Sequence, residues 1–234
     1  MKSLSQCRLY TFVDTACLRG RAPEAVAQQL CDGGADLIQL RAKQSSLDEI
    51  RRMARAILPI TRKAGVGLVI NDHLSIAQEL GAELCHLGQE DFFDAGHTHV
   101  SELRTPHLSR RSQTKADSAL VAPKPGEGGL RIGLSTHSPD QATRALKAGP
   151  DYIAIGPVYA TDTKPFAKPV TLAYVRWAAA HVEIPWFAIG GINLENVDAV
   201  LAAGARRICV VSAILNTDDI AAACREFQAR LTDV

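Results

Sequence analysis

Two apolar runs of the sequence end in acids whose spacing could hold a metal ion. The run "VGLVI" at 66–70 ends in Asn71 and Asp72, and the run "ELCHL" at 83–87 leads into the polar group that ends in Asp91. If the runs are neighbouring strands, the two carboxylates repel each other unless a cation or a shared proton lies between them. Mg²⁺ takes one or two carboxylates together with phosphate oxygens and water. Asp72 and Asp91 therefore predict a Mg²⁺ site, and the alternative is that each acid only caps the following helix.

A second group could bind an anion. In "QLRAK", Gln39, Arg41 and Lys43 fall on alternate residues, so an extended chain directs all three side chains to one side. Two cations beside an amide suit an anion such as diphosphate. The alternative is an inward polar layer whose hydrogen bonds are satisfied within the protein.

Later runs end in further polar groups. "GLSTHS" offers the hydroxyls of Ser135 and Thr136, with His137 as a group that could titrate. "GPVYATDTK" places Thr161, Thr163 and Lys164 on a loop long enough to close over a ligand.

The last two runs predict a separate phosphate site. "AIGGIN" contains Gly190 and Gly191, which permit close backbone approach, and "VVSAI" contains the hydroxyl of Ser212. Turns that lead from the seventh and eighth strands of a barrel into helices commonly hold phosphate with backbone N–H groups. No Ser, Cys or Lys has the surroundings of an activated nucleophile, so covalent catalysis is not expected.

Eight apolar runs must position these residues. They span 8–13, 36–40, 66–70, 83–87, 131–134, 151–155, 185–189 and 207–211. Helical patterns lie between them, for example at 22–34, 46–65, 74–81, 138–149 and 193–204. Continuous apolar runs are typical of parallel strands covered by helices, and this number of βα units predicts a TIM (β/α)₈ barrel forming a single domain over 1–234. An open doubly wound sheet is the alternative.

One segment departs from the pattern. Residues 92–129 are polar and end in Pro and Gly, which predicts a solvated insertion with a short helix near Val100 to Leu108. His97, His99 and His107 lack a partnering Cys or acid pattern, so a metal site there is not favoured.

Composition excludes several classes of function. The net charge is +1, which gives no general attraction to nucleic acid or to anionic membranes. No run approaches the roughly 18 apolar residues of a membrane span, and the first residues lack the features of a signal peptide. The six cysteines show no C-x-x-C spacing, so we expect reduced core thiols in a cytoplasmic protein.

The motifs occur in a recognisable order. "QLRAK", "INDH", "HLGQED", "GLSTHS", "GPVYATDTK", "AIGGI" and "VVSAI" resemble the motif series of thiamine phosphate synthases, collinear from about Leu9 to Ile214. The resemblance implies a transferase that joins 4-amino-2-methyl-5-hydroxymethylpyrimidine diphosphate to thiazole phosphate, giving thiamine phosphate and diphosphate. The family's reaction is dissociative: diphosphate leaves, a methylene cation forms, and the thiazole nitrogen attacks it.

The resemblance also implies roles for individual residues. Mg²⁺ is held by Asp72 and Asp91, and the catalytic residues are Arg41, Lys43, Ser135 and Lys164. The substrate-binding residues are Gln39, Leu40, Arg41, Ala42, Lys43, Asn71, Ser135, Thr161, Asp162, Thr163, Lys164, Gly190, Gly191, Val211 and Ser212. The implied partners are these small-molecule substrates, with self-association into a homo-oligomer compatible with the sequence.

Three departures from the family pattern are visible. The segment after Asp91 is long, Leu84 and Cys85 replace the usual Gly-Val, and Asp162 replaces a commoner Pro or Ser. Two alternatives remain. One is the related thiazole tautomerase, whose relatives typically lack the Gln-Leu-Arg-x-Lys series and the acid pair. The other is a non-catalytic barrel that binds thiazole or thiamine phosphates, which would be expected to have lost Arg41, Asp72 or Lys164.

Overall fold

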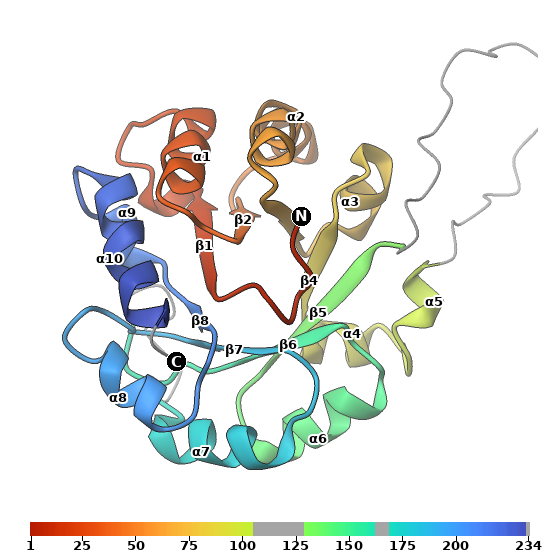
Figure 1. Cartoon of the computed structure of the whole chain (residues 1–234). Coiled ribbons are helices and arrows are strands. Elements are labelled where there is room, and N and C mark those ends of the chain that lie inside the picture. Colours follow the sequence, from red (N-terminus) through yellow and green to blue (C-terminus); the bar gives the residue numbers. More distant parts are fainter. Residues whose placement is uncertain (105–128, 162–168, 233–234) are drawn as a thin grey trace, which may run out of the picture.

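The chain folds into a closed barrel of parallel strands surrounded by helices (Figure 1). The structure, a computed structural model, describes residues 1–104, 129–161 and 169–232. The strands pair in chain order, each with the next, and the last closes on the first. They are β1 (Leu9–Asp14), β2 (Leu37–Arg41), β3 (Gly67–Asn71), β4 (Leu84–Gly88), β5 (Arg131–Thr136), β6 (Tyr152–Ile155), β7 (Trp186–Ile189) and β8 (Ile208–Cys209). The predicted TIM barrel is confirmed, and the open sheet is wrong.

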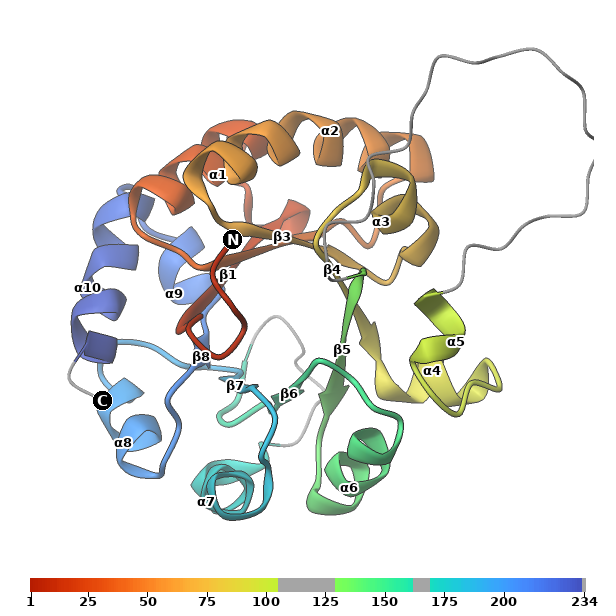
Figure 2. The ribbon, with the colours of Figure 1, turned by 45° about the vertical axis from the view of Figure 1, so that its right-hand side comes forward.

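Helices lie outside the barrel, as Figure 2 shows from a second direction. They are α1 (Pro23–Asp32), α2 (Leu47–Ala64), α3 (Leu74–Leu80), α4 (Gln89–Asp94), α5 (Ser101–Arg104), α6 (Pro139–Lys147), α7 (Thr171–His181), α8 (Val197–Ala202), α9 (Ser212–Leu215) and α10 (Ile220–Thr232), with a 3₁₀ turn η1 (Thr15–Cys17) after β1. Among these helices, none combines the length and apolar composition needed to cross a membrane.

Helix α2 shows how the sequence sets these elements. Its buried residues Ile50, Ala54 and Ile57 recur every three or four positions and form one face toward the barrel. Ser46 and Glu49 form a capping box at its start, and Gly65 adopts the left-handed conformation (φ +69°) that ends it.

Element ends differ from the prediction where backbone turns intervene. The last strand is shorter than 207–211, because Val211 already adopts the turn before α9. The helix predicted at 193–204 is shorter in the structure, where α8 begins four residues later, at Val197. The preceding residues form a turn instead, in which the Asn193 side chain accepts hydrogen bonds from the backbone N–H groups of Glu195 and Asn196.

The first part of the predicted insertion is anchored on the barrel by three buried side chains, Phe92, Val100 and Leu103, although most of the residues between them are exposed. Helix α5 (Ser101–Arg104) lies within the short helix predicted near Val100 to Leu108. The Glu102 carboxylate accepts hydrogen bonds from Thr98 and pairs with the His97 ring. Residues 105–128, including His107, lie outside the described residues. That the whole chain forms a single domain stays a prediction.

Candidate active site

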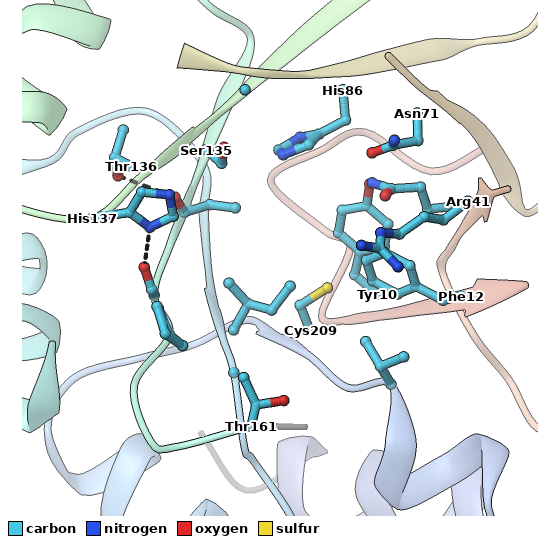
Figure 3. Close-up of a pocket in the computed structure, with 18 of the residues that line it drawn as sticks. Tyr10, Phe12, Arg41, Asn71, His86, Ser135, Thr136, His137, Thr161 and Cys209 are labelled. Carbon is cyan, nitrogen blue, oxygen red and sulfur yellow. Dashed lines mark hydrogen bonds between the residues drawn. The ribbon is translucent and has the colours of Figure 1, made fainter. Parts of the chain in front are cut away.

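A cavity of about 320 Å³ opens where the strands end, at the carboxyl side of the barrel (Figure 3). Its lining includes the last residues of β2, β3, β4, β5 and β7. Most of the predicted site residues meet there: Gln39, Arg41, Lys43, Asn71, Asp72, Asp91, Ser135, Thr161, Gly190, Gly191, Val211 and Ser212. Segments more than a hundred residues apart in sequence thus share one pocket, as the strand-end pattern predicts.

Five predicted residues are not placed in this lining. The side chains of Leu40 and Ala42 are buried in the core, because they alternate with Gln39 and Arg41 and so face the helices. Only their backbone could meet a ligand. Asp162, Thr163 and Lys164 lie outside the described residues, so their predicted roles stay predictions.

Arg41 is held by an acid that the sequence analysis did not identify. Its Nη1 donates to Asp14 Oδ2 at 2.7 Å, and the two side chains are 15% and 2% exposed. Asp14 pairs directly with Arg41 in the β1–β2 register, and its other carboxylate oxygen accepts from the backbone N–H of Ala16. A buried, charge-assisted hydrogen bond therefore fixes the guanidinium at the mouth of the barrel.

Lys43 is the more exposed of the two cations. Its side chain is 55% exposed, and its Nζ lies 3.9 Å from Asp72 Oδ2. An exposed pair at this distance contributes little to stability. Lys43 can therefore turn toward an incoming anion.

The two predicted metal ligands flank the end of β4. The backbone N–H of Asp72 donates to the carbonyl of His86 at 2.9 Å, and the Asp72 carboxylate accepts from the Asn71 amide at 2.6 Å. The Asp91 carboxylate covers Gly88, where an added Cβ would lie 2.5 Å from Asp91 Oδ2.

Neither acid caps a helix, so the capping alternative is wrong for both. Asp72 precedes His73, the N-cap of α3, and Asp91 is already the third residue of α4. Within the described part of the chain, no cluster of three or more His, Cys, Asp or Glu side chains could enclose a metal ion by itself. Two carboxylates at an open pocket fit Mg²⁺, which completes its coordination with phosphate oxygens and water.

The turns after β7 and β8 form the opposite side of the pocket. Gly190 and Gly191 have φ values of +103° and +65°, and a Cβ on Gly191 would lie 2.5 Å from the carbonyl oxygen of Ala160. The amide of Asn196 donates to the Gly191 carbonyl at 2.9 Å and holds this turn. Ser212 is the first residue of α9, where backbone N–H groups lack intrahelical partners.

The end of β5 separates two hydroxyls with different surroundings. Both residues line the pocket, but Thr136 is fully buried, and its hydroxyl bonds to the carbonyl of Ala154 and, at 2.7 Å, to the hydroxyl of Tyr174. His137 lines the pocket with its Nδ1 against the Gly156 carbonyl. Of the two hydroxyls, Ser135 is the one placed to meet a ligand.

The floor of the pocket is aromatic and apolar, which the sequence analysis missed. The rings of Tyr10 and Phe12 stack with centroids 5.6 Å apart, and Cys209 lies beside them (Figure 3). Burial raises the pKa of the Cys209 thiol well above its ordinary value, so it stays protonated and is a poor nucleophile. The floor suits a flat heteroaromatic ring.

Comparison with known proteins identifies the family of this barrel. Residues 9–214 match the family model described as thiamine monophosphate synthase. The chain belongs to this family. The thiamine-phosphate synthase of Thermus thermophilus is 42% identical over 203 residues, covering 86% of this chain and 85% of that protein. The enzyme of Halalkalibacterium halodurans is 36% identical over 225 residues, covering 96% and 95% of the two chains.

A solved structure supports the fold. Thiamine phosphate pyrophosphorylase from Pyrococcus furiosus superposes with a TM-score of 0.75, covering 99% of this chain and 98% of that one at 24% identity. The resemblance to the thiamine phosphate synthase family is therefore confirmed by sequence comparison and is consistent with the barrel.

Proposed function

We propose that this chain joins a pyrimidinylmethyl diphosphate to a thiazole phosphate, forming thiamine phosphate and releasing diphosphate. One observation carries the proposal: residues suited to a diphosphate and turns suited to a second phosphate face each other across one pocket. Family membership supports the same reaction. The aromatic floor between the two sides could accept the heteroaromatic rings.

The bond changes need no nucleophile from the protein. The bond between the pyrimidine methylene carbon and the diphosphate oxygen breaks, and its electron pair leaves with diphosphate. The thiazole nitrogen then donates its lone pair to the methylene cation, forming the new C–N bond. No proton is transferred, so the reaction needs no general acid or base from the protein.

On this proposal, the β2–β4 side stabilises the departing diphosphate. Arg41, already oriented by Asp14, and Lys43 would bind its oxygens. Asp72 and Asp91 are the residues that would hold Mg²⁺. When bound, Mg²⁺ would neutralise part of the charge that develops on the diphosphate.

The other groups would orient the reactants. Gly191 and Ser212 would bind the thiazole phosphate through backbone N–H groups and a hydroxyl, and Ser135 would contact the pyrimidine substrate from β5. Holding both rings in one pocket makes the attack effectively intramolecular. A cytoplasmic location and self-association into a homo-oligomer also stay predictions.

The test is metal-dependent product formation by the purified chain. Given both substrates and Mg²⁺, it should release diphosphate and thiamine phosphate in equal amounts, and EDTA should stop both. Asp72→Ala should lower kcat/KM by at least about 100-fold if its carboxylate stabilises the transition state as other preorganised electrostatic groups do.

A matched control is Asp94→Ala, because Asp94 is exposed on α4 and does not line the pocket. It should behave like the unmodified chain. Absence of both products from folded protein would contradict the proposal, and isomerisation of thiazole phosphate alone would favour a tautomerase.

A further inference from the structure

One buried polar atom in the wall of the pocket lacks a hydrogen-bond partner within the described part of the chain. It is Oε1 of Gln89, the first residue of α4, which lines the pocket and is 4% exposed. Among the described residues, the other such side-chain atom is Nε of Arg207, which does not line the pocket. A buried acceptor without a partner costs about 1–3 kcal/mol, so a residue of this kind calls for a compensating role.

The buried polar side chains nearer the centre of the barrel are paired. The Gln39 amide nitrogen donates to the Tyr10 hydroxyl, and the Tyr152 hydroxyl lies 3.1 Å from Nδ1 of His86. The amide oxygen of Gln89 is therefore an exception to how this barrel treats its buried polar groups.

Packing alone does not account for an amide at this position. Gln89 and Phe92 are the buried residues of α4, and their spacing of three places them on one face of the helix. An apolar side chain of the same length would fill the space of Gln89 and leave no unpaired atom. The amide oxygen is thus better explained by a partner that arrives from the pocket.

The position of Gln89 indicates which reactant supplies that partner. The preceding residue, Gly88, pairs with Ser135 in the β4–β5 register, and Ser135 is the hydroxyl proposed to contact the pyrimidine substrate. The following residue, Glu90, already accepts from the Gln141 amide at 3.3 Å. The free acceptor at this edge of the pocket therefore lies on the side proposed for the pyrimidine diphosphate.

The chemistry of the reactants narrows the partner to one group. An amide oxygen can only accept a hydrogen bond. The phosphate oxygens and the ring nitrogens of both reactants are acceptors as well, so they cannot pair with it. The 4-amino group of the pyrimidine carries N–H donors and matches the free oxygen of Gln89.

We propose that Gln89 is a substrate-binding residue whose Oε1 accepts a hydrogen bond from the 4-amino group of the pyrimidine diphosphate, and that this bond strengthens as the methylene cation forms. The amino nitrogen is conjugated with the methylene carbon, so part of the positive charge reaches it when diphosphate leaves. A donor that gains positive charge forms a stronger hydrogen bond, and the bond then stabilises the transition state more than the bound substrate. This inference rests on the proposed function for the identity of the ligand.

Binding measurements with two ligands test the contact without turnover. The ligands are the pyrimidine diphosphate and an analogue with hydrogen in place of the amino group, titrated calorimetrically with Mg²⁺ and without thiazole phosphate. The unmodified chain should bind the analogue about threefold to tenfold more weakly, the effect of one neutral hydrogen bond. Gln89→Met should lose the same factor for the amino compound and bind the two ligands equally, because the bond they differ by is already absent.

A matched control is Gln28→Met, because Gln28 is exposed on α1 and does not line the pocket. It should discriminate between the two ligands as the unmodified chain does.

Stability and kinetics distinguish a ligand contact from a structural role. Gln89→Met removes an unpaired buried acceptor, so the urea midpoint of the unliganded chain should be unchanged or higher. With both substrates, its kcat/KM for the pyrimidine diphosphate should fall about tenfold to a hundredfold, as expected for a hydrogen bond to a group that becomes charged. The KM for thiazole phosphate should not change.

Several results would overturn the inference. One is a Gln89→Met chain that still discriminates between the ligands, or that loses the same affinity for both, as a contact with a water of Mg²⁺ would produce. Another is a urea midpoint lowered in both Gln89→Met and Gln89→Leu, which would show that the amide supports the fold. A fall in kcat/KM no larger than the fall in affinity would refute the strengthening of the bond. If the unmodified chain bound both ligands equally, this inference alone would fail, whereas binding of neither would refute the proposed function as well.

Discussion

Asp14 illustrates how a residue that touches no substrate can determine the charge of the site. Arg41 would be a flexible cation if it ended β2 alone, but its guanidinium is tied to a carboxylate on the neighbouring strand. The pair leaves the remaining guanidinium N–H groups as donors in a fixed plane, which matches phosphate geometry. The pair orients the Arg41 guanidinium, but the Asp14 carboxylate offsets its positive charge.

Asp14→Asn distinguishes these two effects by the sign of its result. The amide keeps the shape of the side chain but loses the charge-assisted hydrogen bond, so we expect diphosphate to bind about tenfold more weakly, or ~1.4 kcal/mol. Simple charge arithmetic predicts the opposite, because an anion near the site disappears. Calorimetric titration with diphosphate and Mg²⁺ measures the change. Asp218→Asn, at an exposed acid near Arg19, is the control and should leave the affinity unaltered. Tighter binding by Asp14→Asn would rule out positioning.

Some of the residues that the sequence analysis missed could have been predicted from the sequence pattern, and others could not. Asp14 ends β1 one residue beyond the apolar run at 8–13, and Tyr10, Phe12 and Asp14 alternate just as Gln39, Arg41 and Lys43 do. Applying the alternation rule to the first strand would have found them. His86 and Tyr152 gave no such signal, because each lies within an apolar run and their contact depends on Gly133, which lies between them on β5.

At the scale of elements, the turn after β7 depends on glycine for two separate reasons. Gly191 needs its positive φ, and it also packs against the carbonyl oxygen of Ala160 in the loop after β6. Gly65, at the end of α2, has nearly the same φ of +69° but has no atom within 4 Å of an added Cβ. An Ala substitution at either glycine adds the cost of a left-handed backbone conformation. Only the substitution at Gly191, in the proposed phosphate site, also adds a steric clash.

Gly191→Ala should affect both binding and stability, whereas Gly65→Ala should affect stability alone. For Gly65→Ala we expect a loss of about 1 kcal/mol in unfolding free energy, the cost of a left-handed residue, with normal KM values. Gly191→Ala should cost about 1–3 kcal/mol and raise the KM for thiazole phosphate, because the turn must move away from Ala160. Urea unfolding and steady-state kinetics test the pair. A normal KM in Gly191→Ala would show that this turn does not bind the phosphate.

The elements themselves were largely readable from sequence. Each apolar run became a strand because barrel strands are buried on both faces, and the residue that follows each run, except Asp14 after the first, lines the pocket. The segment after Asp91 is polar overall, and its composition did not indicate which side chains pack on the barrel. Phe92, Val100 and Leu103 are spaced irregularly yet are buried, whereas the neighbouring Phe93 is only half-buried. Burial there depends on the barrel surface available to them, which sequence spacing does not reveal.

At the scale of the whole molecule, the expected core thiols have a consequence for stability. All six cysteines are free, and Cys7, Cys85, Cys209 and Cys224 are buried. Burial raises the pKa of Cys7 to about 11 and that of Cys224 to about 12. In the unfolded chain a thiol ionises near pH ~8.5. The folded state therefore holds these protons more tightly than the unfolded state does.

The sign of the pH dependence follows from this difference. A group whose pKa is raised by folding contributes its full stabilisation below its unfolded pKa, and this stabilisation is lost as pH rises toward the folded value. We expect the urea midpoint of the reduced protein to be constant from pH 7 to 8 and to fall between pH 8.5 and 9.5. Each buried thiol contributes about 1 kcal/mol to that fall, because a pH unit above the unfolded pKa is worth ~1.4 kcal/mol. Cys224→Ala, on α10 and outside the pocket lining, should fall less steeply over the same range. A midpoint that stays level to pH 9.5, or a variant that falls in parallel, would show that the thiols ionise equally easily in both states.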